Sequence, residues 1–111
     1  MTNQLNFEQL RAQAASLTIR NKAFINGVYV DAASGKTFDC ISPRDGKILT
    51  QVAECDVEDV NRAVQSARAV FEKGSWSEAS PGKRKAVMMK FADLMEKHAA
   101  ELALLESLDM G

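Results

Sequence analysis

The sequence has little of several residue types, and each shortage excludes a class of protein. Two cysteines in 111 residues are too few for a disulfide framework, so we expect free thiols in a reducing compartment. No apolar run approaches the length of a membrane-spanning helix. The first thirteen residues, MTNQLNFEQLRAQ, lack the basic and apolar regions of a signal peptide. We therefore expect a cytoplasmic protein.

Neither sign of charge dominates, because the sequence has 14 basic and 15 acidic residues. This balance gives no electrostatic reason to expect binding to nucleic acid or to an anionic membrane. Hydrophobic residues make up 46% and charged residues 26%, as in ordinary soluble globular proteins. A chain of this length forms one domain at most, with a modest core.

Residues 1–22 predict a leading helix, followed by a small antiparallel β unit over residues 23–54. Asn6 and Gln9 have the spacing of a capping box at the start of the helix. Asn26-Gly27 lies between short apolar runs in AFINGVYV and predicts a hairpin, because both residues tolerate positive φ. The SPRDG run at 42–46 predicts a turn between strands at 37–41 and 47–54.

Residues 55–111 predict three helices. Asp56 is the expected N-cap of the first, which ends at Lys73-Gly74, and Ser80 caps the second, with Pro81 at its first position. A break near Lys97-His98 separates the second helix from the third, which runs from 99 to 109. The apolar stripes consist of Val57, Val60, Val64, Ala67 and Phe71, then Val87, Phe91, Leu94 and Met95, then Leu102, Leu105 and Leu108.

The polar residues form no recognisable catalytic motif. Cys40 is interpreted as a small apolar residue on a strand face. Cys55 precedes a helix N-terminus, which lowers a thiol pKa, but the flanking carboxylates oppose that effect. His98 has no neighbours at a zinc-ligand spacing, and Ser80 is interpreted as a cap. Trp76 lies near lysines but is expected to anchor two helices rather than to stack on a base.

The glycines form neither a GxGxxG nor a Walker pattern, and Lys83–Lys85 is interpreted as a solvated run. Residue chemistry alone therefore assigns no catalytic and no cofactor-binding residue.

The order of the motifs resembles the N-terminal segment of NAD(P)-dependent aldehyde dehydrogenases over residues 23–111. The motifs that carry the resemblance are FINGVYV, SGKTFDCISPRDGK, DVEDVNRAVQSARAVFEKGSWS and KRKAVMMKFADLMEKHAAELALLESLDMG. Most members have Asn-Pro at the turn, whereas this sequence has Ser42-Pro43. The run from Ser80 to Gly111 is especially similar to the members that oxidise γ-glutamyl-γ-aminobutyraldehyde in putrescine breakdown.

The resemblance implies a Rossmann-like α/β fold for the whole protein, with this chain as the N-terminal part of the coenzyme-binding domain. It implies NAD or NADP as cofactor, a small aldehyde as substrate and a homo-oligomeric state. The family's catalytic cysteine, glutamate and coenzyme-binding glycines would lie beyond Gly111, in a continuing chain. We therefore expect the 111-residue chain alone to be inactive and to serve as a scaffold for the remainder.

The resemblance also implies one candidate ion site. Several members bind a monovalent cation through backbone oxygens and an aspartate at positions that match Cys40, Ile41 and Asp109. Carbonyl and carboxylate oxygens suit a hard cation. The alternative is that Asp109 merely ends a helix.

A rival hypothesis is a self-standing helical interaction module without catalysis. The stripes Val60/Val64/Phe71 and Val87/Phe91/Leu94 would then cover each other, and Leu104 would belong to a second buried face. The aldehyde, the choice between NAD and NADP and the oligomeric state stay open at this stage.

Overall fold

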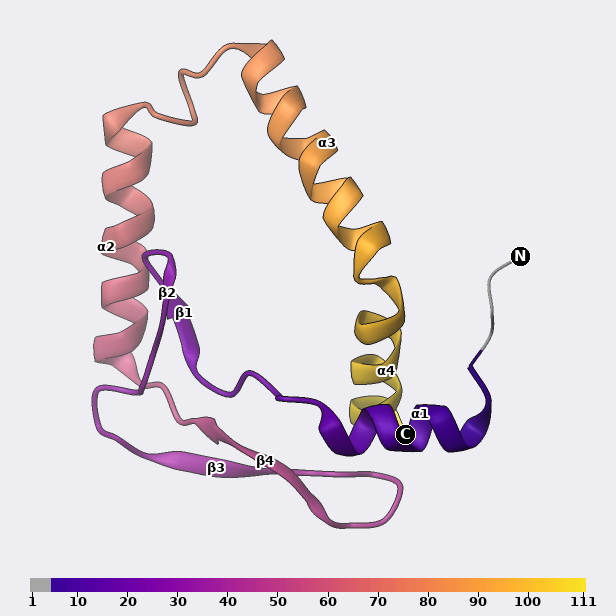
Figure 1. Ribbon diagram of the computed structural model, residues 1–111. Helices are drawn as coiled ribbons and strands as arrows, with labels where there is room; N and C mark the ends of the chain where they lie inside the picture. Colours follow the sequence, from indigo (N-terminus) through magenta and orange to yellow (C-terminus); the bar gives the residue numbers. More distant parts are fainter. Residues whose placement is uncertain (1–4) are drawn as a thin grey trace.

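The computed structural model describes residues 5–111, which form two β-hairpins and four helices arranged as an open frame (Figure 1). The order of helix, β unit and three helices confirms the prediction. In chain order the elements are α1 (Phe7–Ser16), β1 (Ala23–Ile25), β2 (Val28–Val30), β3 (Thr37–Ile41), β4 (Ile48–Ala53), α2 (Val57–Lys73), α3 (Pro81–Lys97) and α4 (Ala99–Met110).

The strands form two separate two-stranded antiparallel sheets, β1–β2 and β3–β4, and not one continuous unit. The first hairpin turns at Asn26 and Gly27, whose φ angles of 53° and 79° confirm the predicted positive-φ turn. In the second hairpin, Cys40 pairs with Thr50 and Ile41 pairs with Ile48, so the register shifts by one residue between them. Such a bulge bends the strand and disturbs the backbone pairing locally.

Local capping residues set the helix ends. Asp56 caps α2, whose C-terminal residue Gly74 takes the left-handed conformation with φ of 73°. Ser80 accepts a hydrogen bond from Lys83 N–H at the start of α3, and His98 marks the break between α3 and α4. Within residues 5–111 no helix combines the length and apolar character needed to cross a membrane.

Asp59 joins the first hairpin to α2. Its carboxylate accepts hydrogen bonds from the backbone N–H of Ala33 at 2.9 Å and of Asp56 at 3.1 Å. Arg62 Nη2 donates to the same carboxylate at 2.7 Å. The side chain is only 2% exposed, so these three donors replace the water that a carboxylate normally binds. The backbone N–H groups of Asp56 and Ala33, followed by the Arg62 charge, hold the Asp59 pKa below its ordinary value of 3.8.

The lowered Asp59 pKa predicts acid sensitivity of this connection. Because the folded-state pKa is depressed, the stabilisation is present above pH 3.8 and is lost as the pH falls through the folded-state value. In a pH titration of the complete protein followed by hydrogen exchange, we expect the amide protons of Ala33 and Asp56 to lose protection together with a midpoint below 3.8. Asp59→Asn should abolish that titration. Arg62→Gln should preserve most of the depression, since the backbone donors are its larger causes, and a midpoint at or above 3.8 would contradict the assignment.

The frame buries little apolar surface of its own. Its extents are 49 × 44 × 18 Å, so one dimension is much thinner than the other two. Among the described residues, Ala32 and Leu108 are the buried hydrophobic side chains. Helices α2 and α3 stand apart in Figure 1. The members of their predicted stripes remain 42–61% exposed: Val60, Val64, Phe71, Val87, Phe91 and Leu94. The expectation that these stripes cover each other is therefore wrong for the chain by itself.

Candidate functional site

The C-terminal end of α4 meets the β3–β4 hairpin, and we call this region, residues 40–44 and 105–111, the α4 junction. Cys40 Sγ donates a hydrogen bond to Asp109 Oδ1 at 3.7 Å, although 69 positions separate the two residues. Leu108, 7% exposed, packs at the centre of the junction. The structure therefore brings together two of the three residues of the predicted cation site.

The backbone near Cys40 and Ile41 is the other part of the predicted site. The Ile41 side chain is a hydrocarbon without a donor atom, so only its backbone oxygen could serve as a ligand. The bulge lies between these two residues and changes the direction of the backbone there. Asp109 adds a carboxylate beside Cys40. In residues 5–111 no three His, Cys, Asp or Glu side chains gather as a metal-binding group. The residues present thus fit a hard cation held mainly by oxygen, and not a zinc-type centre.

A cavity of about 310 Å³ adjoins this pair. Its polar wall includes Thr50, whose Oγ1 accepts a hydrogen bond from Asn21 Nδ2 at 3.2 Å, and this bond ties the segment after α1 to β4. The lining residues are Ile19, Cys40, Leu49, Thr50, Leu105, Glu106, Leu108 and Asp109.

The turn between β3 and β4 is built on Ser42, which stands where most family members are expected to have asparagine. Ser42 is 1% exposed, and its Oγ accepts a hydrogen bond from Arg44 N–H at 3.3 Å. A serine hydroxyl can replace an asparagine side chain in this role. The turn also contacts Gly111, because a Cβ at that glycine would lie 3.0 Å from Pro43 Cγ. With φ of 80°, Gly111 ends α4 in the left-handed region that favours glycine.

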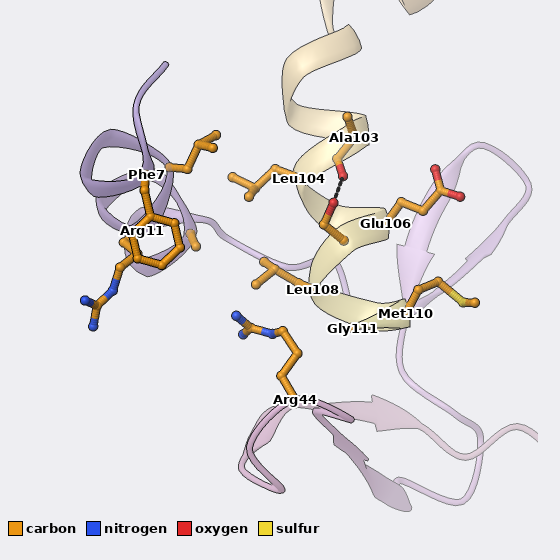
Figure 2. Close-up of a pocket in the computed structure, with 12 residues that line it drawn as sticks. Phe7, Arg11, Arg44, Ala103, Leu104, Glu106, Leu108, Met110 and Gly111 are labelled. Atoms are coloured by element: carbon orange, nitrogen blue, oxygen red, sulfur yellow. Dashed lines mark hydrogen bonds between the residues drawn. The ribbon is translucent and has the colours of Figure 1, made fainter. Parts of the chain in front are cut away.

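A larger groove lies on the other side of Leu108, between α1 and α4 (Figure 2). Its volume is about 770 Å³, and we call it the α1–α4 groove. Leu104, predicted to belong to a second buried face, is half-buried here. The lining residues are Phe7, Leu10, Arg11, Ala14, Arg44, Ala103, Leu104, Glu106, Ser107, Leu108, Met110 and Gly111.

Two features of the structure were not foreseen from the sequence. The role of Asp59 was missed, although Asp56 and Asp59 have the spacing of a capping box and could have been recognised from it. The groove was missed because it joins residues from both ends of the chain, which no local pattern connects.

The remaining candidates stay apart from the α4 junction. Cys55 is exposed, and His98 Nδ1 lies 3.9 Å from Glu101 Oε2 on the helix surface. Trp76 is 41% exposed, so its side chain is only partly covered. Ser80 caps α3, as predicted.

Comparison with known proteins places these features in a family. The sequence profile described as "Aldehyde dehydrogenase family" matches residues 29–111. The NADP/NAD-dependent aldehyde dehydrogenase PuuC of Escherichia coli K12 is 50% identical over 110 residues, which cover 96% of this chain and 22% of that protein. The chain spans about a fifth of the length of such curated relatives: 22% of PuuC and 22% of an aminoacetaldehyde dehydrogenase of Pseudomonas aeruginosa.

Solved structures match both the sequence and the frame. Indole-3-acetaldehyde dehydrogenase AldA of P. syringae, in complex with NAD+ and IAA, is 55% identical, with a TM-score of 0.94 over 97% of this chain and 22% of that chain. The γ-glutamyl-γ-aminobutyraldehyde dehydrogenase of Burkholderia cenocepacia is 48% identical, with a TM-score of 0.92 over 95% of this chain and 21% of that chain.

Proposed function

This chain belongs to the aldehyde dehydrogenase family, and we propose that it is the N-terminal part of the coenzyme-binding domain of an enzyme that oxidises an aldehyde to a carboxylic acid with NAD+ or NADP+. In that enzyme its role is structural: α2 and α3 present apolar faces to the rest of the protein. The 111-residue chain contributes no catalytic residue and is inactive alone.

The observation that carries this proposal is a frame that matches a solved enzyme closely and yet has almost no core. A stable domain normally buries its apolar helix faces against a second layer. Here Val57, Val60 and Phe71 on α2 are 57–68% exposed. The same arrangement occurs within a much longer aldehyde dehydrogenase chain, with a TM-score of 0.94. A frame of this kind is best explained as one layer of a larger core.

For the substrate, γ-glutamyl-γ-aminobutyraldehyde has the support of the sequence resemblance and of the Burkholderia cenocepacia relative. The P. syringae relative, whose name specifies indole-3-acetaldehyde, shares this segment at a similar identity of 55%. Relatives with different aldehydes in their names thus share this segment, so we assign the choice of aldehyde to residues outside it. Assay of the complete native enzyme against both aldehydes, with NAD+ and NADP+, tests γ-glutamyl-γ-aminobutyraldehyde as the substrate. A preference for indole-3-acetaldehyde would overturn that assignment.

A chimera tests the structural role. In it, this chain replaces the matched 110 residues of PuuC from Escherichia coli K12, and we call the product the PuuC chimera. We expect the chimera to reduce NAD+ in the presence of an aldehyde. PuuC without its matched segment should be inactive, and so should the 111-residue chain alone. Aldehyde oxidation by the 111-residue chain, or an inactive chimera, would contradict the proposal.

The rival interaction module makes a different prediction for the isolated chain. A self-standing module should be monodisperse and unfold cooperatively. With its helix faces exposed, the 111-residue chain is expected instead to aggregate or to unfold without a sharp transition. Light scattering and thermal unfolding monitored by circular dichroism distinguish the two.

The complete enzyme is proposed to be a cytoplasmic homo-oligomer, which native mass measurement and cell fractionation test.

The α4 junction is proposed to bind a monovalent cation through Asp109 and backbone oxygens of Cys40 and Ile41. Asp109→Asn in the PuuC chimera should then abolish any stabilisation by K+ or Na+ relative to tetramethylammonium at equal ionic strength. A cation present at about 100 times its dissociation constant would contribute about 2.7 kcal/mol before the substitution. Asp39→Asn, which changes a carboxylate that bonds Gln51 on the same hairpin, is the matched control. An equal cation effect in Asp109→Asn and the parent chimera would exclude this site.

A further inference from the structure

The α1–α4 groove has the composition of a docking surface. Its apolar wall includes Phe7 on α1 and Met110 on α4, which are 71% and 75% exposed. Figure 2 shows the side chains of Leu104 and Leu108 extending from α4 toward α1, so the floor between the helices is apolar. An exposed concave surface of this kind favours a partner with apolar side chains.

Two arginines are among the residues that border this apolar floor. Arg11 comes from α1 and Arg44 from the β3–β4 turn, and both line the groove. Within residues 5–111 the ion pairs are Lys22–Asp31, Arg62–Asp59, Arg68–Glu72 and His98–Glu101, so neither groove arginine has a carboxylate within 4.0 Å. Arg11 instead lies over the Phe7 ring, 5.8 Å from its centroid. Glu106, the acidic member of the lining, extends in Figure 2 from the side of α4 that faces away from α1.

One of the two arginines also has a local role. The last turn of α4 contains no basic residue of its own, and Arg44 brings a positive charge to that end of the helix. Such a charge stabilises a helix C-terminus. A guanidinium has five N–H donors, so this role leaves Arg44 able to bind a carboxylate as well.

The groove is not a peculiarity of the short chain. AldA of P. syringae matches 97% of this chain with a TM-score of 0.94, so the overall arrangement of its elements recurs in a chain of which this segment is 22%. The family profile begins at residue 29, so α1 lies before the part that it describes.

From these observations we infer that the α1–α4 groove receives a segment of the remaining part of the same enzyme chain, and that this segment places a carboxylate between Arg11 and Arg44 while its apolar side chains cover Phe7 and Leu104. The inference rests on the proposed function. A free inorganic anion would leave the apolar floor exposed, whereas an acidic, apolar polypeptide satisfies both parts of the surface.

Photo-crosslinking in the PuuC chimera tests which polypeptide occupies the groove. The photoreactive residue p-benzoylphenylalanine replaces Phe7, and a second chimera carries it in place of Phe24, which is 64% exposed on the first hairpin. We expect the residue at position 7 to link to one Asp- or Glu-containing peptide of the same chain, identified by mass spectrometry. A link between two subunits, or the same peptide distribution from both positions, would overturn the inference.

Charge reversal tests the arginines. The double substitution Arg11→Glu and Arg44→Glu should lower the yield of that crosslink at least about tenfold, because two attractions become repulsions. The matched control, Lys83→Glu with Lys90→Glu on α3, changes two charges that do not line the groove and should leave the yield unchanged. Raising the salt concentration should weaken the crosslink in the parent chimera but not in the groove variant.

The two proposals fail in different ways. An inactive PuuC chimera refutes the proposed function. An active chimera whose crosslink is insensitive to reversal of Arg11 and Arg44 refutes only the carboxylate partner.

Discussion

Leu108→Ala is expected to release the end of α4 from both of its neighbours. Leu108 lines the α1–α4 groove on one side and the cavity beside Cys40 on the other, and it is 7% exposed. Removing three heavy atoms from such a position loses the transfer free energy of the buried atoms and leaves a cavity. Leucine-to-alanine changes of this kind cost about 2–5 kcal/mol.

Hydrogen exchange is the appropriate measurement, because a large enzyme does not unfold in one step. In the PuuC chimera, the free energy of opening for residues 104–110 should fall by about 2–5 kcal/mol in Leu108→Ala. Leu108→Met conserves volume and should cost less than about 1.5 kcal/mol. Equal exchange in the two variants would show that Leu108 does not hold the α4 junction together.

The elements were predictable from the sequence because their signals are local. Asn26-Gly27, Asp56 and Ser80 each act on a few neighbouring backbone groups, so their roles could be read without knowledge of the fold. All three took the predicted conformations. The connection between α2 and the loop after the first hairpin was less predictable, because Asp59 binds the backbone of Ala33, 26 positions away.

The apolar stripes show the limit of this reasoning. Periodicity identifies which face of a helix avoids water, but it does not say which surface covers that face. Val64 and Phe91 both lie on predicted stripes, yet they are 61% and 56% exposed in the 111-residue chain. The assumption that the stripes of α2 and α3 meet each other was therefore wrong, and the burial of these faces against another surface stays a prediction.

The candidate site also has one part that could be predicted from the sequence and one part that could not. Cys40 and Asp109 could be named beforehand only through the family resemblance, because no short-range pattern relates residues 69 positions apart. Their contact in the structure agrees with that choice, whereas cation binding itself stays a prediction. The α1–α4 groove lacked even this signal, since Arg11 and Arg44 are unremarkable surface residues until α1 and the turn are placed beside α4.

Gly111→Ala is expected to disturb the same junction from the backbone side. At φ of 80° an alanine incurs the steric cost of the left-handed region, about 1–2 kcal/mol. Its Cβ would also approach Pro43 Cγ to 3.0 Å, so the β3–β4 turn would have to move away from α4. Two other glycines separate these effects. Gly46 has φ of 70° with nothing within 4 Å, whereas Gly82, on α3, has open space and no positive φ.

The three alanine variants should therefore rank in a fixed order by the loss of protection from hydrogen exchange in the PuuC chimera, measured for each variant in the segment around its own glycine. Gly82→Ala should be neutral or stabilise α3 by about 0.4–1 kcal/mol. Gly46→Ala should show the conformational cost within its own turn, and Gly111→Ala should add displacement of Pro43 to that cost. If Gly111→Ala and Gly46→Ala prove equal, the contact with Pro43 is dispensable. A larger effect of Gly111→Ala means that the hairpin turn and the helix end hold each other in place, which is the arrangement that keeps Asp109 beside Cys40.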